Sequence, residues 1–133
     1  YVIAHDSGRI VNPLLADAQV VGGVMQGIGG AIKEAMVYDD AGQPLSGSFM
    51  DYAMPIASDG PEFILEHIES LSPRNPLGVK GLGEGGAIGP PAAVANAIED
   101  ALREFGVVVR EGPLSPSRVR RLIEESPNFA KVA

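Results

Sequence analysis

Residues 12–35 carry the pattern that most restricts what this chain can fold into. Asn12 suits a helix cap, and Pro13 suits the first helical position, where an amide hydrogen is not needed. Apolar side chains then recur at three- and four-residue steps, which is the spacing of one helix face. The members of this face are Leu14, Ala18, Val21, Met25, Ile28, Ile32 and Ala35. We therefore predict a long helix that packs through this face.

A second face of the same helix has almost no side-chain volume. Its members are Gln19, Gly22, Gly23, Gln26, Gly27 and Gly30. Each interior glycine costs about 1 kcal/mol relative to alanine, so something must approach the helix backbone closely and compensate for that cost. Tight packing of a neighbouring element is the simpler explanation, and a bound ligand is the other. In either case the Gln26 amide stands nearly alone on a smooth surface.

The remaining patterns predict an α+β domain with a small mixed or antiparallel sheet packed with two long helices. Strand signals fall in residues 1–4, 61–70 and 106–110, and a hairpin is expected around the turn at residues 39–42. Residues 71–89 form a long loop, a length that is usually functional or disordered. Helices are predicted from Pro90 and over residues 115–126, where Ser115 and Pro116 serve as the cap and the first helical residue.

Composition excludes several functional classes. The chain has 133 residues, a formal charge of −7 and a pI of about 4.7, so attraction to nucleic acid is not expected. Cysteine is absent, which removes disulfides, thiolate nucleophiles and cysteine-held metals. No apolar run is long enough for a membrane span, and we expect a soluble, cytoplasmic protein. Because the chain starts with Tyr1 in a strand-like run, we also expect it to be a piece of a longer polypeptide.

The two histidines do not predict a metal site. His5 and His67 lie far apart and lack the short spacings at which histidines share a metal ion. We expect structural or surface roles for both, and no metal held by protein side chains.

The loop "KGLGEGGAIGPP" presents a single carboxylate, Glu84, among glycines. Gly81, Gly83 and Gly86 satisfy G-x-G-x-x-G, but no apolar strand precedes them and Glu84 would repel a pyrophosphate, so we reject a dinucleotide fold. One alternative is that the glycines wrap a bound group and aim Glu84 at it as a general base. The other is a solvated acid, or one that favours the start of the helix at Pro90. Lys80 suits an anion ligand or a surface charge equally.

Two motifs together carry a family resemblance. The segments "GGVMQGIGGAI" and "KGLGEGGAIGPP", in this order and at this distance, resemble the C-terminal part of the molybdopterin-binding large subunit of the xanthine oxidase family. Within the family, we expect the greatest likeness to the carbon monoxide dehydrogenase and bacterial aldehyde oxidoreductase branch. The resemblance covers residues 1–124, as a segment of the molybdenum cofactor-binding domain, and leaves residues 125–133 as a tail.

The resemblance implies a molybdenum hydroxylase that inserts a water-derived oxygen into a small substrate, such as carbon monoxide, an aldehyde or an N-heterocycle. Glu84 would be the base beside the metal and Gln26 a cofactor contact, while Lys80, Gly81, Gly83 and Gly85 would line the cofactor. The cofactor would be molybdopterin with molybdenum, in a family where the cytosine dinucleotide form is frequent. The metal would be held by the pterin, so no protein ligand set is needed.

The resemblance also implies partners. These are the remainder of the large subunit and the subunits or domains that carry iron–sulfur and flavin centres, so the segment alone is expected to be inactive. An alternative from another class is a non-catalytic folding or assembly module. Such a module would dock on another chain, or form a homo-oligomer, through the Gly/Gln helix face.

Overall fold

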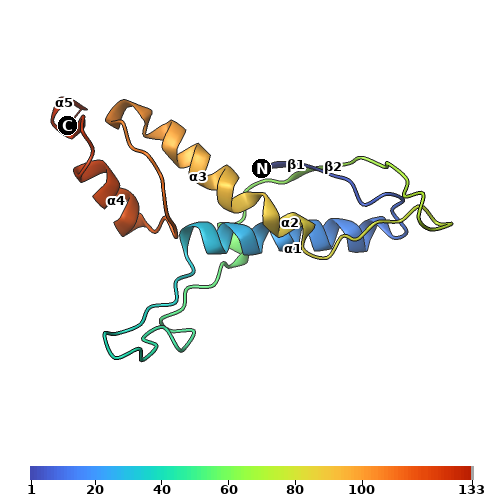
Figure 1. Ribbon diagram of the computed structural model, residues 1–133, viewed down its shortest axis with the longest axis horizontal. Helices are drawn as coiled ribbons and strands as arrows, with labels where there is room; N and C mark the ends of the chain where they lie inside the picture. Colours follow the sequence, from blue (N-terminus) through green and yellow to red (C-terminus); the bar gives the residue numbers. More distant parts are fainter. Residues whose placement is uncertain (133) are drawn as a thin grey trace. The chain divides into compact units, whose positions relative to one another are not determined.

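The computed structural model describes residues 1–132 (Figure 1). The chain forms two compact units. Unit 1 consists of Tyr1–Gly27 and Ile56–Gly89, and unit 2 consists of residues 28–55 and the residues from 90 onward. Helix α1, Pro13–Ile32, contributes residues to both units. Strands and helices both occur, which confirms the predicted α+β class.

Unit 1 contains the two strands of the sheet. Strand β1, Val2–His5, pairs with β2, Ile64–His67, in parallel register from Val2 opposite Ile64 to His5 opposite His67. The expected antiparallel or mixed pairing is therefore wrong for these strands. The chain passes through α1 and a 3₁₀ turn, η1, at Ala57–Asp59, before β2, and such a crossover allows parallel pairing. Side-chain exposure alternates along both strands, as the sequence predicts.

Helix α1 begins where the sequence predicts, but a different face is buried. The Asn12 carboxamide oxygen accepts a hydrogen bond from the Leu15 amide at 3.2 Å. Leu14, assigned to the apolar face, is 77% exposed. The buried residues on α1 include Ala16, Val20, Val24, Ile28 and Ala31. The predicted face is wrong in phase because Gly23 lets neighbouring backbone approach the other side of the helix, and close packing there outweighs side-chain size.

The loop at residues 71–89 is irregular as predicted, except for one short helix. Helix α2, Gly85–Ile88, forms inside it although glycine is a poor helix former. An isolated antiparallel bridge joins Gly8 and Val79 near the start of the glycine-rich part. Tertiary contacts of α2 with α1, described below, override the weak local preference.

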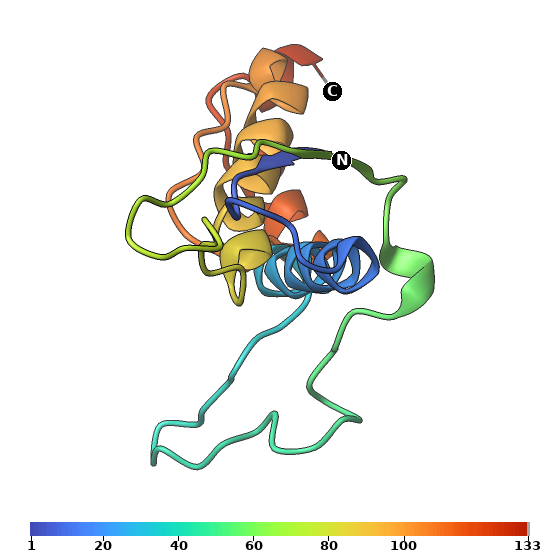
Figure 2. The ribbon, with the colours of Figure 1, turned by 90° about the vertical axis from the view of Figure 1, so that its right-hand side faces the viewer.

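The predicted hairpin is present in unit 2 only as a turn closed by one antiparallel bridge, and the two short strands expected around it do not form. Tyr38 and Pro44 form an antiparallel bridge, and the Asp39 amide donates to the Gln43 carbonyl at 3.0 Å. Gly42 has a φ of +82°, a left-handed conformation that favours glycine at this turn. The hairpin belongs to residues 33–55, which leave the C-terminal end of α1 as a long irregular excursion (Figures 1 and 2).

Helix α3, Pro90–Ala101, starts at the predicted proline and is followed by a 3₁₀ turn, η2, at Arg103–Phe105. The predicted strand at residues 106–110 is wrong, because within residues 1–132 this segment pairs with no strand. Val107 is buried, but Val108 is 54% exposed. The Val109 amide donates instead to the Glu99 carboxylate at 2.7 Å, which satisfies the hydrogen bond that a strand partner would supply.

The last predicted helix is confirmed. Helix α4 spans Pro116–Glu124, and the Ser115 hydroxyl accepts a hydrogen bond from the Arg118 amide at its N-terminus. The predicted tail contains a further short helix, α5, at Phe129–Val132. Before it, the Asn128 side chain donates to the Glu104 carbonyl at 3.2 Å. Ala133, also part of the predicted tail, lies outside the described residues.

Candidate functional site

The glycine loop, defined here as residues 80–86, is anchored at its first residue. Just before it, Asn75 bonds Val79 twice, donating to the Val79 carbonyl at 2.9 Å and accepting from the Val79 amide at 3.1 Å. The Lys80 amide then donates to the Ser7 carbonyl at 2.8 Å. Together with the Gly8–Val79 bridge, these bonds fix the backbone where the loop begins.

The Lys80 side chain belongs to a cluster with Asp6 and Ser70. Its ammonium group lies 2.7 Å from the Asp6 carboxylate and 2.5 Å from the Ser70 hydroxyl. Asp6 also accepts hydrogen bonds from the Ser70 hydroxyl and from the amides of Gly8 and Ser70. The Lys80 ammonium, followed by the Ser70 and Gly8 donors, holds the pKa of Asp6 well below its usual range.

Helix α1 supports the other end of the loop through its backbone. A Cβ placed on Gly23 would lie 2.9 Å from the Gly86 Cα, and one placed on Gly86 would collide with the Val20 carbonyl oxygen. Both positions therefore need glycine for this close approach. The Gln19 side chain donates to the Gly83 carbonyl at 2.7 Å, so α1 also holds the residue that precedes Glu84.

His5 adds a contact from the sheet. Its Nδ1 lies 2.8 Å from the Ser7 hydroxyl, and its Nε2 occupies the space that a side chain on residue 85 would need. Gly85 is thus required for packing against His5, a structural role that agrees with the expectation for this histidine. His67, at the end of β2, lies 2.7 Å from the Asp17 carboxylate and has a structural role too.

Glu84 itself is exposed. It occupies the N-cap position of α2, its carbonyl accepts from the Ala87 amide at 2.9 Å, and its carboxylate makes no capping hydrogen bond within the described chain. A Cβ on Gly81 or Gly83 would meet no described atom within 4 Å. The loop is therefore anchored to α1 and to Ser7, and no described atom covers the open side at Gly81 and Gly83. The described residues do not shield the Glu84 carboxylate from water.

The predicted site residues divide into two groups. Lys80, Gly81, Gly83, Glu84 and Gly85 follow one another in the glycine loop. Gln26 lies three residues beyond Gly23 on α1, is exposed, and has no hydrogen-bond partner in the part of the chain that the structure describes. Gly22 is equally open, since a Cβ added there would meet no described atom within 4 Å. The predicted contact between a neighbour and the helix backbone is thus found at Gly23 but not at Gly22.

Sequence reasoning missed the residues that hold the loop. Local patterns place Asp6 only in a turn and Gln19 only on the smooth helix face. Their partners lie 74 and 64 residues away in the sequence, and no local pattern links such positions. Among residues 1–132, no group of three or more His, Asp or Glu side chains is arranged to hold a metal ion. Within the same residues, none of the helices combines the length and the hydropathy that a membrane span requires.

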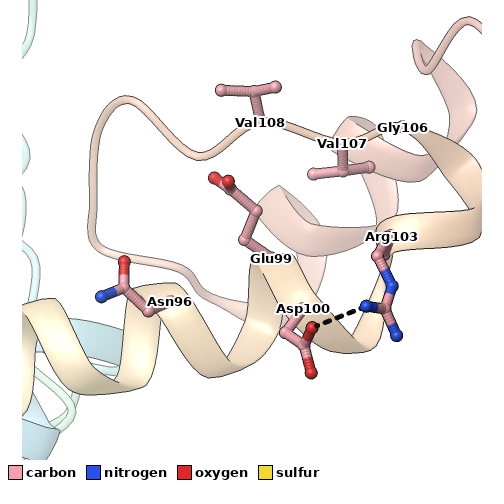
Figure 3. Close-up of a pocket in the computed structure, with 7 residues that line it drawn as sticks. All are labelled: Asn96, Glu99, Asp100, Arg103, Gly106, Val107 and Val108. Carbon is pink, nitrogen blue, oxygen red and sulfur yellow. Dashed lines mark ion pairs between the residues drawn. The ribbon is translucent and has the colours of Figure 1, made fainter.

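Two open cavities lie in the separate units. A cavity of about 330 Å³ beside the glycine loop is lined by residues that include Arg9, Asn12, Gln19 and Lys80. Another, of about 400 Å³, lies between α3 and residues 106–108 of unit 2 (Figure 3). The acids of this second cavity are already paired, since Asp100 lies 3.6 Å from Arg103 and Glu99 accepts from Val109. It contains none of the predicted site residues.

Comparisons with known proteins agree with the motifs. A family model described as the molybdopterin cofactor-binding domain matches residues 1–61. The nicotine 6-hydroxylase large subunit of Paenarthrobacter nicotinovorans is 47% identical over 117 residues, which are 88% of this chain and 14% of that subunit. The carbon monoxide dehydrogenase large chain of Hydrogenophaga pseudoflava is 31% identical over 120 residues, which are 90% of this chain and 15% of that protein.

A solved structure shows the same fold. Quinoline 2-oxidoreductase from Pseudomonas putida 86 matches with a TM-score of 0.91 and 40% identity, over 95% of this chain and 16% of that one. Identities to the carbon monoxide dehydrogenase chain and to an aldehyde oxidoreductase subunit, 31% and 32%, are lower than the 47% to the nicotine 6-hydroxylase subunit, so the greater likeness expected to the carbon monoxide and aldehyde branch is wrong. The chain spans about one seventh of the length of the molybdopterin-binding large subunits that it matches, and it belongs to their family, the xanthine oxidase family.

Proposed function

We propose that this chain is the C-terminal segment of a molybdopterin-dependent hydroxylase, and that it supplies the general base and part of the cofactor-binding surface. The enzyme would oxidise a small substrate with oxygen taken from water. Glu84 is the base in this proposal, and Gln26, Lys80, Gly81, Gly83 and Gly85 contribute to the surface around the cofactor. Relatives at 47% and 40% identity that are named as a hydroxylase and an oxidoreductase support the reaction class.

One observation carries the role of Glu84. The glycine loop is held at three points, Lys80 by Ser7 and Asp6, Gly83 by Gln19, and Gly86 by the α1 backbone, yet the Glu84 side chain is exposed. An ordinary surface loop does not need so many anchors. A loop that must present one side chain in a fixed place does, because misplacement of a catalytic group by about 1 Å can cost about 100-fold in rate.

The residues fit a flat, polar cofactor. Gly81 and Gly83 leave the space above them free of described atoms, so a bound group could approach the backbone. Gln26 offers an amide that no described residue uses. Molybdopterin would bring its own metal ligands and supply the two-electron redox chemistry, which leaves binding, orientation and proton transfer to the protein.

Glu84 would perform the proton transfer. As a carboxylate, it can accept the proton of the hydroxyl group that attacks the substrate carbon. The described residues leave it open to solvent, so the rest of the large subunit would have to exclude water from the site. Such a division of roles, with the base on this chain and the water-excluding residues elsewhere in the subunit, agrees with a chain that spans only 14% of a relative's length.

For the substrate, we favour an N-heterocycle over carbon monoxide or an aldehyde. The relatives named for nicotine and quinoline are 47% and 40% identical, whereas the carbon monoxide dehydrogenase chain is 31% identical. Turnover of a pyridine or quinoline ring by the full-length enzyme, compared with carbon monoxide and benzaldehyde, tests this choice. Faster turnover of either of the latter two would contradict it.

The decisive experiment is Glu84→Gln in the full-length enzyme, purified from cells able to make the cofactor. We expect kcat to fall by at least about 100-fold, because general-base catalysis contributes typically about 100- to 10,000-fold. Molybdenum content should stay unchanged. Glu66→Gln, at an exposed position of β2, is the matched control and should retain full activity. Retained turnover in Glu84→Gln would overturn the proposal.

We further propose a cytoplasmic enzyme whose iron–sulfur and flavin centres reside on partner subunits or domains, with a cytosine dinucleotide form of the cofactor. A relative described as part of a dehydrogenase complex supports the presence of other subunits. Acid release of the nucleotide from the purified enzyme, followed by chromatography, distinguishes a cytidine nucleotide from a pterin without a nucleotide.

An assembly module remains the second candidate, favoured by the open Gly22 position and the unpartnered Gln26 among the described residues. In this case the helix face would dock on another chain or on a second copy. Gln26→Glu would then weaken assembly of the full-length protein without lowering kcat in the assembled fraction. Light scattering that shows unchanged assembly would contradict this candidate.

A further inference from the structure

We propose that Asp6, Ser70 and Lys80 form a positioning cluster, which holds the start of the glycine loop so that Glu84 keeps its place. The inference rests on the proposed role of Glu84 as the base. For Lys80 it replaces the cofactor contact proposed above with positioning of the loop through Asp6.

The cluster joins three segments of unit 1 through one carboxylate. Asp6 follows β1, Ser70 follows β2, and Lys80 begins the glycine loop. The carboxylate accepts from the Lys80 ammonium at 2.7 Å, from the Gly8 amide at 2.9 Å, from the Ser70 amide at 3.3 Å and from the Ser70 hydroxyl. A carboxylate with this many donors has little freedom to move, so it can fix Lys80 relative to both strands.

The position of the cluster explains why the loop needs it. Glycine loses more conformational freedom on folding than any other residue, so a loop with glycine at positions 81 and 83 needs anchors at both ends. Gln19 and the Gly23–Gly86 contact hold the end near Glu84. The Asp6 cluster and the Lys80–Ser7 backbone bond hold the beginning. Residues 81 and 82 are the span between the two sets of anchors.

The ion pair between Lys80 and Asp6 favours a positioning role for Lys80 over direct binding of the cofactor. The Lys80 ammonium already faces one full negative charge at 2.7 Å and a hydroxyl at 2.5 Å. The side chains of Lys80 and Asp6 are 35% and 30% exposed, so the pair is partly shielded from water. A cation in this arrangement is neutralised by its partner and is a weak ligand for a second anion.

The test compares Asp6→Asn, Lys80→Met and the double variant in the full-length enzyme. Each single change should lower kcat by about 100-fold, as expected for a misplaced base. The double variant should be no slower than the slower single variant, because both changes disrupt the same interaction. KM and molybdenum content should remain within about twofold of wild type, since uniform binding is not affected. Arg120→Gln, which breaks an exposed ion pair on α4, is the control and should keep wild-type kcat.

A second readout needs no bound cofactor. Hydrogen exchange of the cofactor-free, full-length protein should show faster exchange at the Lys80 amide in Asp6→Asn than in wild type, with no change in α4. If Lys80→Met or Asp6→Asn fails to fold, Ser70→Ala removes one donor to Asp6 and one acceptor of Lys80, and should show a smaller loss of kcat with the same faster exchange.

The outcomes separate this inference from the proposed function. Loss of molybdenum or a large rise in KM in Lys80→Met, with wild-type behaviour in Asp6→Asn, would show direct binding by Lys80 and overturn the positioning role. Wild-type kcat in both single variants, with Glu84→Gln inactive, would also overturn positioning while leaving the base intact. Full activity of Glu84→Gln would instead remove the proposed function on which the inference rests.

Discussion

At the scale of single residues, Gly22 and Gly23 are neighbours on α1 with opposite surroundings. A Cβ on Gly22 would meet no described atom within 4 Å, whereas one on Gly23 would lie 2.9 Å from the Gly86 Cα and 3.0 Å from the Ala87 amide nitrogen. We expect Gly22→Ala to stabilise the chain by up to about 1 kcal/mol through helix propensity. Gly23→Ala should destabilise it by about 1–3 kcal/mol, because backbone atoms of α2 cannot move aside without cost.

Urea unfolding of the two variants checks this pair of predictions, and each variant serves as the control of the other. A Gly23→Ala protein as stable as wild type would mean that α1 and α2 do not approach as described. If Gly22→Ala destabilised the full-length enzyme but not the 133-residue chain, another part of the subunit would cover this position.

The Asp6 carboxylate should make the stability of the folded chain depend on pH. Its pKa in the folded state is lowered, chiefly by the Lys80 ammonium, so its stabilising effect is present above the unfolded-state pKa and is lost as the pH falls. We therefore expect Asp6→Asn to be less stable than wild type at neutral pH, and the difference to shrink below about pH 4, the ordinary pKa range of aspartate. Urea unfolding at a series of pH values measures this difference. A stability gap that widened on acidification would contradict the assignment.

At the scale of elements, α4 shows how a local signal sets a helix boundary. The Ser115 hydroxyl accepts from the Arg118 amide, and Pro116 occupies the first helical position. Ser115→Ala should lower the free energy of unfolding by about 1 kcal/mol, because one helix amide loses its partner.

The matched control lies after the same helix. The buried Ser126 hydroxyl has no hydrogen-bond partner among the described residues, so Ser126→Ala should be neutral or stabilising. Thermal unfolding of both variants distinguishes them. Equal losses of stability would show that the two hydroxyl groups do not differ as described.

At the scale of the whole molecule, the excursion at residues 33–55 exposes large apolar side chains. Phe49 is 83% exposed and Met50 is 96% exposed. Exposed apolar patches favour association, so we expect the 133-residue chain to self-associate and the double change of Phe49→Ser and Met50→Ser to reduce this. Size-exclusion chromatography with light scattering gives the measurement. Asp40→Ser, a polar change in the same excursion, should leave association unchanged.

The sequence by itself determined the features that depend on neighbouring residues. Asn12 with Pro13, and Ser115 with Pro116, mark helix starts because caps act within one turn. The alternation in β2 and the turn before Gly42 are equally local. The contiguous glycine loop around Glu84 could also be identified, because its residue types stand next to one another.

Only the tertiary structure decided the features that depend on distant contacts. The packed face of α1 follows from the approach of Gly86 to Gly23, and the parallel pairing of β1 with β2 follows from the crossover between them. Residues 106–110 lack a strand because Glu99, not a neighbouring strand, binds the Val109 amide. Asp6 meets Lys80 across 74 residues and Gln19 meets Gly83 across 64, so sequence spacing could not place the groups that hold Glu84. The physical reason is that burial and hydrogen bonding reward whichever long-range contacts the folded chain can satisfy together.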